Sequence, residues 1–301
     1  MNETSKEILE NYQVRKTKAQ KTRFIEFMET RYPELRVEEG GFPKNRNLVI
    51  GDVESAKAVL SAHYDTCAVL PFPNFIMPKN LLVSIFYGVL IAVPIILVAV
   101  LAGRGALALT DEPLLSLLAY FAVFITLFAA MFCGKPNKHT VNDNTSGVVT
   151  LCELLGSLSP EERSEIAFVF FDNEENGLLG SSWFNKVHRA EMKDKLLINY
   201  DCVSDGDNIM LLPNKNAKKE YLPALGEAFC GAGDKNIIVE TGLVYYPSDQ
   251  GNFKKNIGVA AFRRCALGLY LNRIHTPKDT VMDERNIGII CDGTKKFLEK
   301  I

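Results

Sequence analysis

The chain has 301 residues, which fits one large domain or two small ones, and 47% of them are hydrophobic. A formal net charge of -2 and a pI of about 6.2 argue against a protein that binds nucleic acid through a basic surface. Most of the hydrophobic excess lies between Leu81 and Gly134, so the remainder has the composition of an ordinary soluble domain.

The cysteines and the N-terminal residues bear on the compartment. Seven cysteines are odd in number and show no CxxC spacing, which is typical of reduced thiols in a cytoplasmic protein. The first residues are polar and acidic, with no basic segment leading into an apolar one, so we expect no cleavable signal.

The N-terminal part of the chain alternates between helical and strand patterns. Apolar side chains recur at helical spacing in residues 5–31, which predicts an amphipathic helix or a helix pair. The basic residues between Arg15 and Arg23 could form a membrane or nucleic-acid patch, but we interpret them as a solvated helix face. Residues 35–50 predict a strand hairpin, and residues 58–62 predict a short buried strand.

Two apolar stretches follow, at residues 81–103 and 114–134, and neither contains a charged residue. Each is long enough to cross roughly 30 Å of hydrocarbon as a helix. A polar turn at residues 104–113 would join them into a hairpin with both ends on one side of a bilayer. A buried helix pair in a soluble core is the alternative, but core helices seldom remain uncharged over such lengths.

Charges near the two stretches predict the orientation. Lys79, Lys135 and Lys138 flank the outer ends, whereas Arg104 lies in the turn beside two acidic residues. The positive-inside rule then makes the chain a membrane protein with two spanning helices and puts its main body in the cytoplasm.

The hairpin would interrupt an otherwise continuous domain. We therefore predict a discontinuous domain made of residues 1–78 and 135–301, and an inserted transmembrane hairpin of residues 79–134.

Acidic residues appear directly after predicted strands. Residues 165–171 form an apolar run that stops at Glu174 and Glu175, and residues 196–200 form another that ends at Asp201. In open α/β sheets ligands bind at this end of the strands. Adjacent carboxylates beside a hydrophobic core need a partner, and a metal ion is the simplest one. The alternative is the acidic first turn of a solvated helix.

The remaining candidates lie in loops. Asp143 comes just before a helix that runs from about residue 148 to 158, although its neighbours also suit a simple helix cap. His63 ends the strand at residues 58–62, and Asp65 can fix the tautomer of a metal-binding imidazole. His275 follows a short strand at residues 259–262, before a final helix near residues 284–298.

Five metal ligands therefore stand at separate strand or loop ends: His63, Asp143, Glu175, Asp201 and His275. This set suits a pair of Zn²⁺ ions, for which imidazole and carboxylate are both normal ligands. Two ions roughly 3.5–4 Å apart lower the pKa of a shared water. Glu174, next to a ligand, can then take the proton from that water.

Five motifs together resemble the M28 family of di-zinc aminopeptidases. The family's HxD motif is matched by His63-Tyr-Asp65, and its [DN]-D-N-x-S-G motif by residues 142–147. Its paired glutamates with G-L-x-G-S are matched by residues 174–181, and its later aspartate by Asp201. Its H-T-x-x-D motif is matched by His275 with Asp279. The resemblance covers nearly all of the chain apart from the apolar hairpin. It implies a three-layer α/β/α fold with a mixed, mostly parallel central sheet.

The resemblance also implies the roles of individual residues. Asp143 would bridge two zinc ions, with His63 and Asp201 completing one site and Glu175 and His275 the other. Glu174 would be the general base, and Asp65 would orient His63.

The chain departs from the family at two places. Many members have S-D-H where this chain has Ser248, Asp249 and Gln250, and some have a tyrosine where Ile274 precedes the last histidine. An oxyanion-stabilising tyrosine would then be Tyr245 or Tyr246, and we favour Tyr245.

The leading hypothesis is a membrane-tethered zinc aminopeptidase that removes N-terminal residues from peptides. A glutaminyl-cyclase-like acyltransferase on the same fold is the closest alternative. Such enzymes work with one zinc, whereas this chain retains the ligands of both sites. A catalytically inactive receptor or scaffold is the third, but such relatives typically lose ligands.

Overall fold

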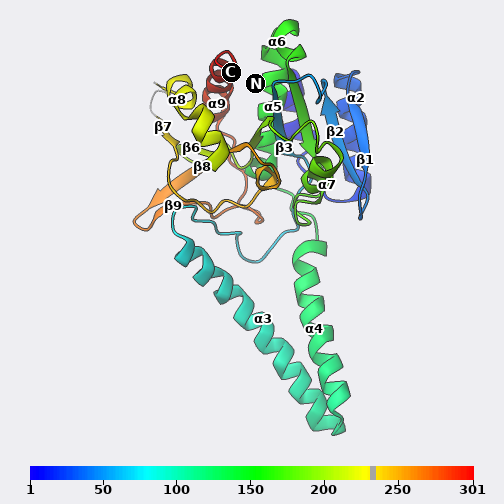
Figure 1. The fold of residues 1–301 in the computed structure, drawn as a ribbon. Helices are drawn as coiled ribbons and strands as arrows, with labels where there is room; N and C mark the ends of the chain where they lie inside the picture. The colour runs from blue at the N-terminus through cyan, green and yellow to red at the C-terminus, as the bar shows by residue number, and fades with distance from the viewer. Residues whose placement is uncertain (231–234) are drawn as a thin grey trace.

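The computed structural model describes residues 1–230 and 235–301, and within them a nine-stranded sheet lies between helices (Figure 1). Its strands follow the order β1-β2-β4-β3-β5-β8-β6-β7, and β9 pairs with β8. The four central strands run parallel: β4 (Ile166–Phe171), β3 (Ala58–His63), β5 (Leu196–Tyr200) and β8 (Asn256–Cys265). The outer strands are β1 (Arg36–Gly40), β2 (Asn45–Ile50), β6 (Asn208–Pro213), β7 (Asn236–Val239) and β9 (Gly268–Tyr270).

Helices cover both faces of the sheet because successive strand residues point to opposite sides. Leu60 and Ile198 pack in the larger core, whereas their neighbours Val59 and Leu197 pack in a second core with Phe184 of α7 (Leu179–Val187). The larger core is covered by α1 (Glu3–Asn11), α2 (Lys18–Arg31), α5 (Ser146–Ser157), α8 (Lys215–Ala228) and α9 (Glu284–Leu298). A short helix, α6 (Pro160–Ser164), precedes β4. The predicted three-layer α/β/α fold is confirmed.

Most predicted elements are present, with differences in length. The strand hairpin is formed by β1 and β2, the helical pattern at residues 5–31 is a helix pair, and the final helix has the predicted bounds. Strands β6 and β7 were not predicted. Helix α8 begins at Lys215, where Asn214 caps it by accepting hydrogen bonds from two backbone N–H groups.

The two apolar stretches form long helices, α3 (Leu81–Thr110) and α4 (Pro113–Cys133), that extend away from the sheet (Figure 1). The predicted polar turn from Arg104 to Pro113 is wrong, since α3 continues through most of it. Residues 106–109 alternate Ala and Leu, which are among the best helix formers, so the connection shrinks to Asp111 and Glu112.

Both helices are long and apolar enough to cross a membrane, by length and composition. In their most apolar 18-residue windows only 6% of α3 and 0% of α4 is buried in the protein. A helix pair inside a soluble core would be mostly buried, so the alternative raised from the sequence does not describe these helices.

The basic segment before and within α2 is not simply a solvated face. Arg15 is fully buried, and it donates from Nε to the carbonyl of Tyr64 and from Nη1 to Thr145. Lys21 is also buried and lies 2.5 Å from Asp172, so this part of the interpretation is wrong. Buried charges need partners, and the partners here lie on distant segments.

Candidate metal centre

The five predicted ligands converge at the carboxyl ends of the central strands. His63 is the last residue of β3, Glu175 follows β4, and Asp201 directly follows β5. Asp143 comes from the turn before α5, and His275 from the loop after β9. Parallel neighbours in the sheet bring the first three together, since their strands end at the same edge.

Asp143 lies between the two histidines. Its Oδ1 is 3.4 Å from His63 Nε2, and its Oδ2 is 3.1 Å from His275 Nε2. On the His275 side, Glu175 Oε2 lies 3.2 Å from His275 Nε2, and on the other side Asp201 Oδ1 lies 3.6 Å from His63 Nε2. The side chains therefore form two groups that share one carboxylate.

Both groups contain buried carboxylate oxygens that lack a hydrogen-bond partner and could bind a metal ion. Glu175 Oε1 and Asp201 Oδ1 are buried and have no hydrogen-bond partner in residues 1–230 and 235–301. His63, Asp143 and Glu175 offer ligand atoms within 4.8 Å of one another, as do His63, Glu174 and Asp201. Buried carboxylate oxygens without donors are costly, and a bound cation removes that cost.

Burial and neighbouring charges shift the pKa values of the carboxylates in this cluster. Burial raises the pKa of Glu174 well above its usual value, and Asp249 and Glu175 raise it further, against the opposing effect of His63. Burial also opposes ionisation of Asp143, but hydrogen bonds to His275 and His63 lower its pKa below the usual value. The buried carboxylates therefore repel one another, and a bound cation would reduce this repulsion.

Two further aspartates hold the backbone on which the ligands stand. Asp65 accepts the backbone N–H of Glu174 at 2.9 Å and that of Glu175 at 3.2 Å. Asp279 accepts the backbone N–H of Asn142 at 2.7 Å and that of Asp143 at 3.0 Å. Each carboxylate therefore fixes one of the two turns that supply acidic ligands.

A family model described as peptidase family M28 matches residues 127–292, which is more than half of the chain. The chain belongs to peptidase family M28. This membership places it among peptide hydrolases. No curated protein matches the sequence of the chain.

Solved structures with the same fold support this assignment at the level of architecture. A Zn-dependent exopeptidase from Parabacteroides distasonis has a TM-score of 0.59 and 15% identity, over 98% of this chain and 96% of that chain. A glutaminyl cyclase from an Acidobacteriales bacterium has a TM-score of 0.59 and 14% identity, over 99% and 92%. The LapA aminopeptidase of Legionella pneumophila has a TM-score of 0.55 and 12% identity, over 98% and 69%.

The loop that departs from the M28 pattern is tied to β5. The side-chain amide of Asn199 donates to Ser248 Oγ at 3.0 Å and to Gln250 Oε1 at 2.9 Å. Between them Asp249 is fully buried, and burial raises its pKa to about 7. No role was predicted for Asp249 from the sequence. Its position in the family's S-D-H segment was the available signal.

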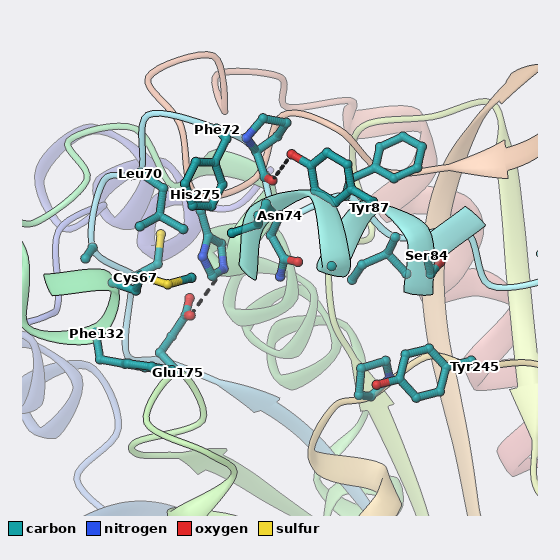
Figure 2. A pocket seen from close by; sticks show the side chains of 18 of the residues that line it. Cys67, Leu70, Phe72, Asn74, Ser84, Tyr87, Phe132, Glu175, Tyr245 and His275 are labelled. Carbon is teal, nitrogen blue, oxygen red and sulfur yellow. Dashed lines mark hydrogen bonds and ion pairs between the residues drawn. The ribbon is translucent and has the colours of Figure 1, made fainter. Parts of the chain in front are cut away.

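The two tyrosines considered for the oxyanion differ in exposure. Tyr246 donates its hydroxyl to the backbone carbonyl of Asp201 at 3.0 Å, so that group already has a partner. The side chain of Tyr245 is half exposed and lines a cavity that also reaches Glu175 and His275. Figure 2 shows Tyr245 across this cavity from the Glu175–His275 pair.

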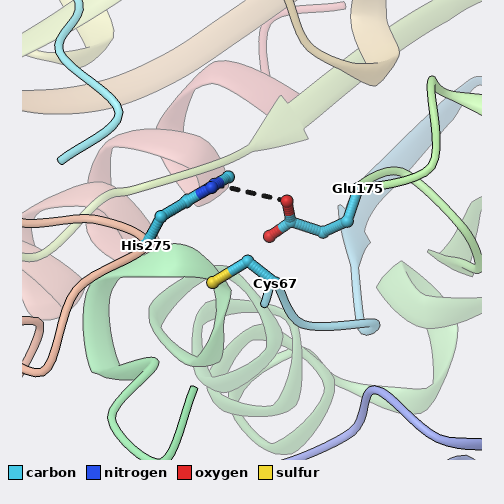
Figure 3. A group of neighbouring side chains, drawn as sticks. All are labelled: Cys67, Glu175 and His275. Carbon is cyan, nitrogen blue, oxygen red and sulfur yellow. Dashed lines mark ion pairs between the residues drawn. The ribbon is translucent and has the colours of Figure 1, made fainter. Parts of the chain in front are cut away.

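The cavity lined by Tyr245, Glu175 and His275, which we call the site pocket, has a volume of about 370 Å³. Glu175, His275 and Cys67 meet at its wall (Figure 3), with one ligand atom of each within 4.8 Å of the others. Cys67 is a buried free thiol. The pocket therefore leads directly to two of the proposed metal ligands, Glu175 and His275.

Proposed function

We propose that this chain is a zinc-dependent aminopeptidase, tethered to a membrane, that removes N-terminal residues from peptides. The observation that supports it best is the position of Asp143, whose two carboxylate oxygens each face a different histidine. One carboxylate that faces two ligand groups is what a pair of ions sharing a bridge requires.

The distances between these side chains support two ligand sets. Asp143 would bridge the two ions, His63 and Asp201 would complete one site, and Glu175 and His275 would complete the other. Imidazole and carboxylate ligands suit zinc, and the similar Parabacteroides structure is described as Zn-dependent. Bound zinc would supply the positive charge that lowers the pKa of a water and polarises the carbonyl of the peptide bond.

The chain's own residues would then position and move the proton. A carboxylate oxygen of Glu174 lies within 4.8 Å of ligand atoms of His63 and Asp201, where it would accept a proton from the attacking water and deliver it to the leaving amine. Asp65 would keep the Glu174 turn and His63 in place. Tyr245 would donate a hydrogen bond to the developing oxyanion from the pocket wall.

The membrane part of the proposal rests on α3 and α4. We assign residues 79–134 to a hairpin that spans the bilayer twice, and residues 1–78 and 135–301 to the peptidase domain. The exposed apolar surfaces of both helices support this division. Lys79, Lys135 and Lys138 lie on the domain side of the hairpin, so the domain would face the cytoplasm.

A glutaminyl cyclase is the second candidate, because one similar structure carries that description. The experiment that separates the candidates uses full-length protein in detergent with added zinc. We expect hydrolysis of leucine and alanine 4-nitroanilides, none of their N-acetylated forms, and no cyclisation of a peptide with N-terminal Gln. Cyclisation without hydrolysis would favour the acyltransferase, and inactivity of the zinc-loaded protein would favour a scaffold.

A further inference from the structure

The site pocket is built partly from the hairpin. Glu175 and His275 line one side of the cavity together with Phe132 of α4, and Ser84 and Tyr87 of α3 line the other side (Figure 2). The α4 wall consists of Met131 and Phe132, close to the end of that helix. An anchor that only held the domain near a bilayer would have no reason to line the cavity beside the metal ligands.

The α3 wall is a regular helical stripe. Ser84, Tyr87, Gly88 and Ile91 line the pocket, and their spacing of three, four and seven residues puts them on one face of the helix. Leu82 and Phe86 lie on the remaining surface and are 79% and 69% exposed. Within residues 84–91, one face of α3 thus belongs to the pocket, whereas Leu82 and Phe86 are free to contact lipid.

Both helix ends are fastened to the segments that carry the site. Tyr87 donates its hydroxyl to the carbonyl of Pro73 at 2.9 Å, and its ring packs on Phe75 with centroids 5.1 Å apart. Residue Leu70 of the same segment donates its backbone N–H to the carbonyl of His275 at 2.8 Å. On the other side, Lys16 Nζ donates to the carbonyl of Phe132. The pocket wall therefore has a fixed position relative to the ligands.

We propose that the hairpin forms part of the substrate site, and that the site pocket receives a large apolar N-terminal side chain of a peptide lying at the membrane surface. Aromatic and aliphatic groups line the cavity: Leu70, Phe72, Phe75, Ile91 and Phe132. Such a lining favours burial of an apolar group over a polar one. Because the wall is made from the domain-side ends of α3 and α4, the occupant would arrive at the level of the bilayer surface. This inference rests on the proposed aminopeptidase function for its chemistry.

Gly88 offers a direct test. It lines the pocket, and a Cβ built there meets no other atom within 4 Å, so a large side chain fits at this position beside the cavity. Gly88→Phe should therefore occupy the space of the substrate side chain. Gly105 is the matched control, since it lies in the same helix, also has no atom within 4 Å and is absent from the pocket lining.

The first measurement compares kcat/KM for phenylalanine and alanine 4-nitroanilides. Gly88→Phe should lower the value for the phenylalanine substrate about 10-fold or more relative to that for alanine, whereas Gly105→Phe should leave the ratio unchanged. An unchanged ratio in Gly88→Phe, or an equal change in Gly105→Phe, would overturn the inference.

The second measurement does not depend on turnover. A peptide that begins with p-benzoylphenylalanine is photo-crosslinked to the Glu174→Gln protein in lipid vesicles, and the adduct is located by mass spectrometry. We expect crosslinks to residues 84–91 of α3, and their absence would overturn the inference. If these crosslinks form but the protein cleaves no aminoacyl substrate, the proposed aminopeptidase activity is wrong. The inference that the pocket binds the N-terminal side chain would still hold.

Discussion

Asp65 and Glu174 are joined by a hydrogen bond in which Asp65 Oδ1 accepts the backbone N–H of Glu174 at 2.9 Å. The other carboxylate oxygen accepts the N–H of Glu175. By contrast, Asp65 Oδ1 is 3.7 Å from His63 Nδ1, and the Asp65 backbone carbonyl lies closer to that nitrogen, at 3.1 Å. The carboxylate therefore acts mainly on the turn that presents the proposed base and one proposed ligand.

Asp65→Asn should lower kcat/KM by about 10- to 100-fold, the usual cost of losing a group that orients metal ligands. An amide has one acceptor oxygen, so one of the two backbone N–H groups would lose its partner. Steady-state hydrolysis of leucine 4-nitroanilide measures the effect. Asp52→Asn is the control, because Asp52 is an exposed residue that caps its own turn. Equal activity of the two variants would exclude this role for Asp65.

Glu174→Gln should keep the bound metal and lower kcat by about 10²- to 10⁴-fold, because the amide cannot accept the proton. Parallel measurements of kcat and of zinc content separate loss of the base from loss of a ligand. The exposed Glu26→Gln variant on α2 should behave as the unmodified protein. If Glu174→Gln retains full turnover, the general base is another residue.

Phe184→Ala should destabilise the domain by about 3–5 kcal/mol, since it leaves a cavity in the second core. Phe184 is fully buried, and its ring lies 5.5 Å from that of Phe171 and 6.4 Å from that of Phe253. Thermal unfolding in detergent measures the change. Phe42→Ala removes the same side chain from a position that is 98% exposed, and it should leave the unfolding temperature nearly unchanged. Similar shifts in both variants would refute the packing argument.

Replacing residues 81–134 with a short Gly/Ser linker should release the protein from membranes. The full-length chain should resist extraction by alkaline carbonate, because two uncharged apolar helices remain in the bilayer. Immunoblots of the pellet and the supernatant report both outcomes. Extraction of the full-length chain by carbonate would contradict the assignment of α3 and α4 as spanning helices.

The strand ends, and the convergence of the five proposed ligands, could be predicted from the sequence. β5 and α9 have the predicted bounds, and the five proposed ligands lie together as expected. The reason is physical: short apolar runs with polar termini define buried strands, and parallel strands present their carboxyl ends at one edge. These features are local in the sequence.

Features that depend on distant partners could not be predicted. Arg15 and Lys21 have the pattern of a solvated helix face, but they are buried because Tyr64 and Asp172 lie against them in the fold. The stripe of α3 residues that lines the pocket could not be predicted either, since Tyr87 and Gly88 look like any other residues of an apolar run in the sequence. Periodicity identifies a helix face but not what the face contacts.

The most direct test of the two-ion centre is the zinc content of the purified full-length protein and of its Asp143→Ala variant, determined by elemental analysis after zinc loading and dialysis. We predict two zinc ions per chain, fewer than two in Asp143→Ala, and two in the control Asp111→Ala, which lies in the connection between α3 and α4. A zinc-loaded protein that retains no metal, or an Asp143→Ala variant that retains two ions, would contradict the account.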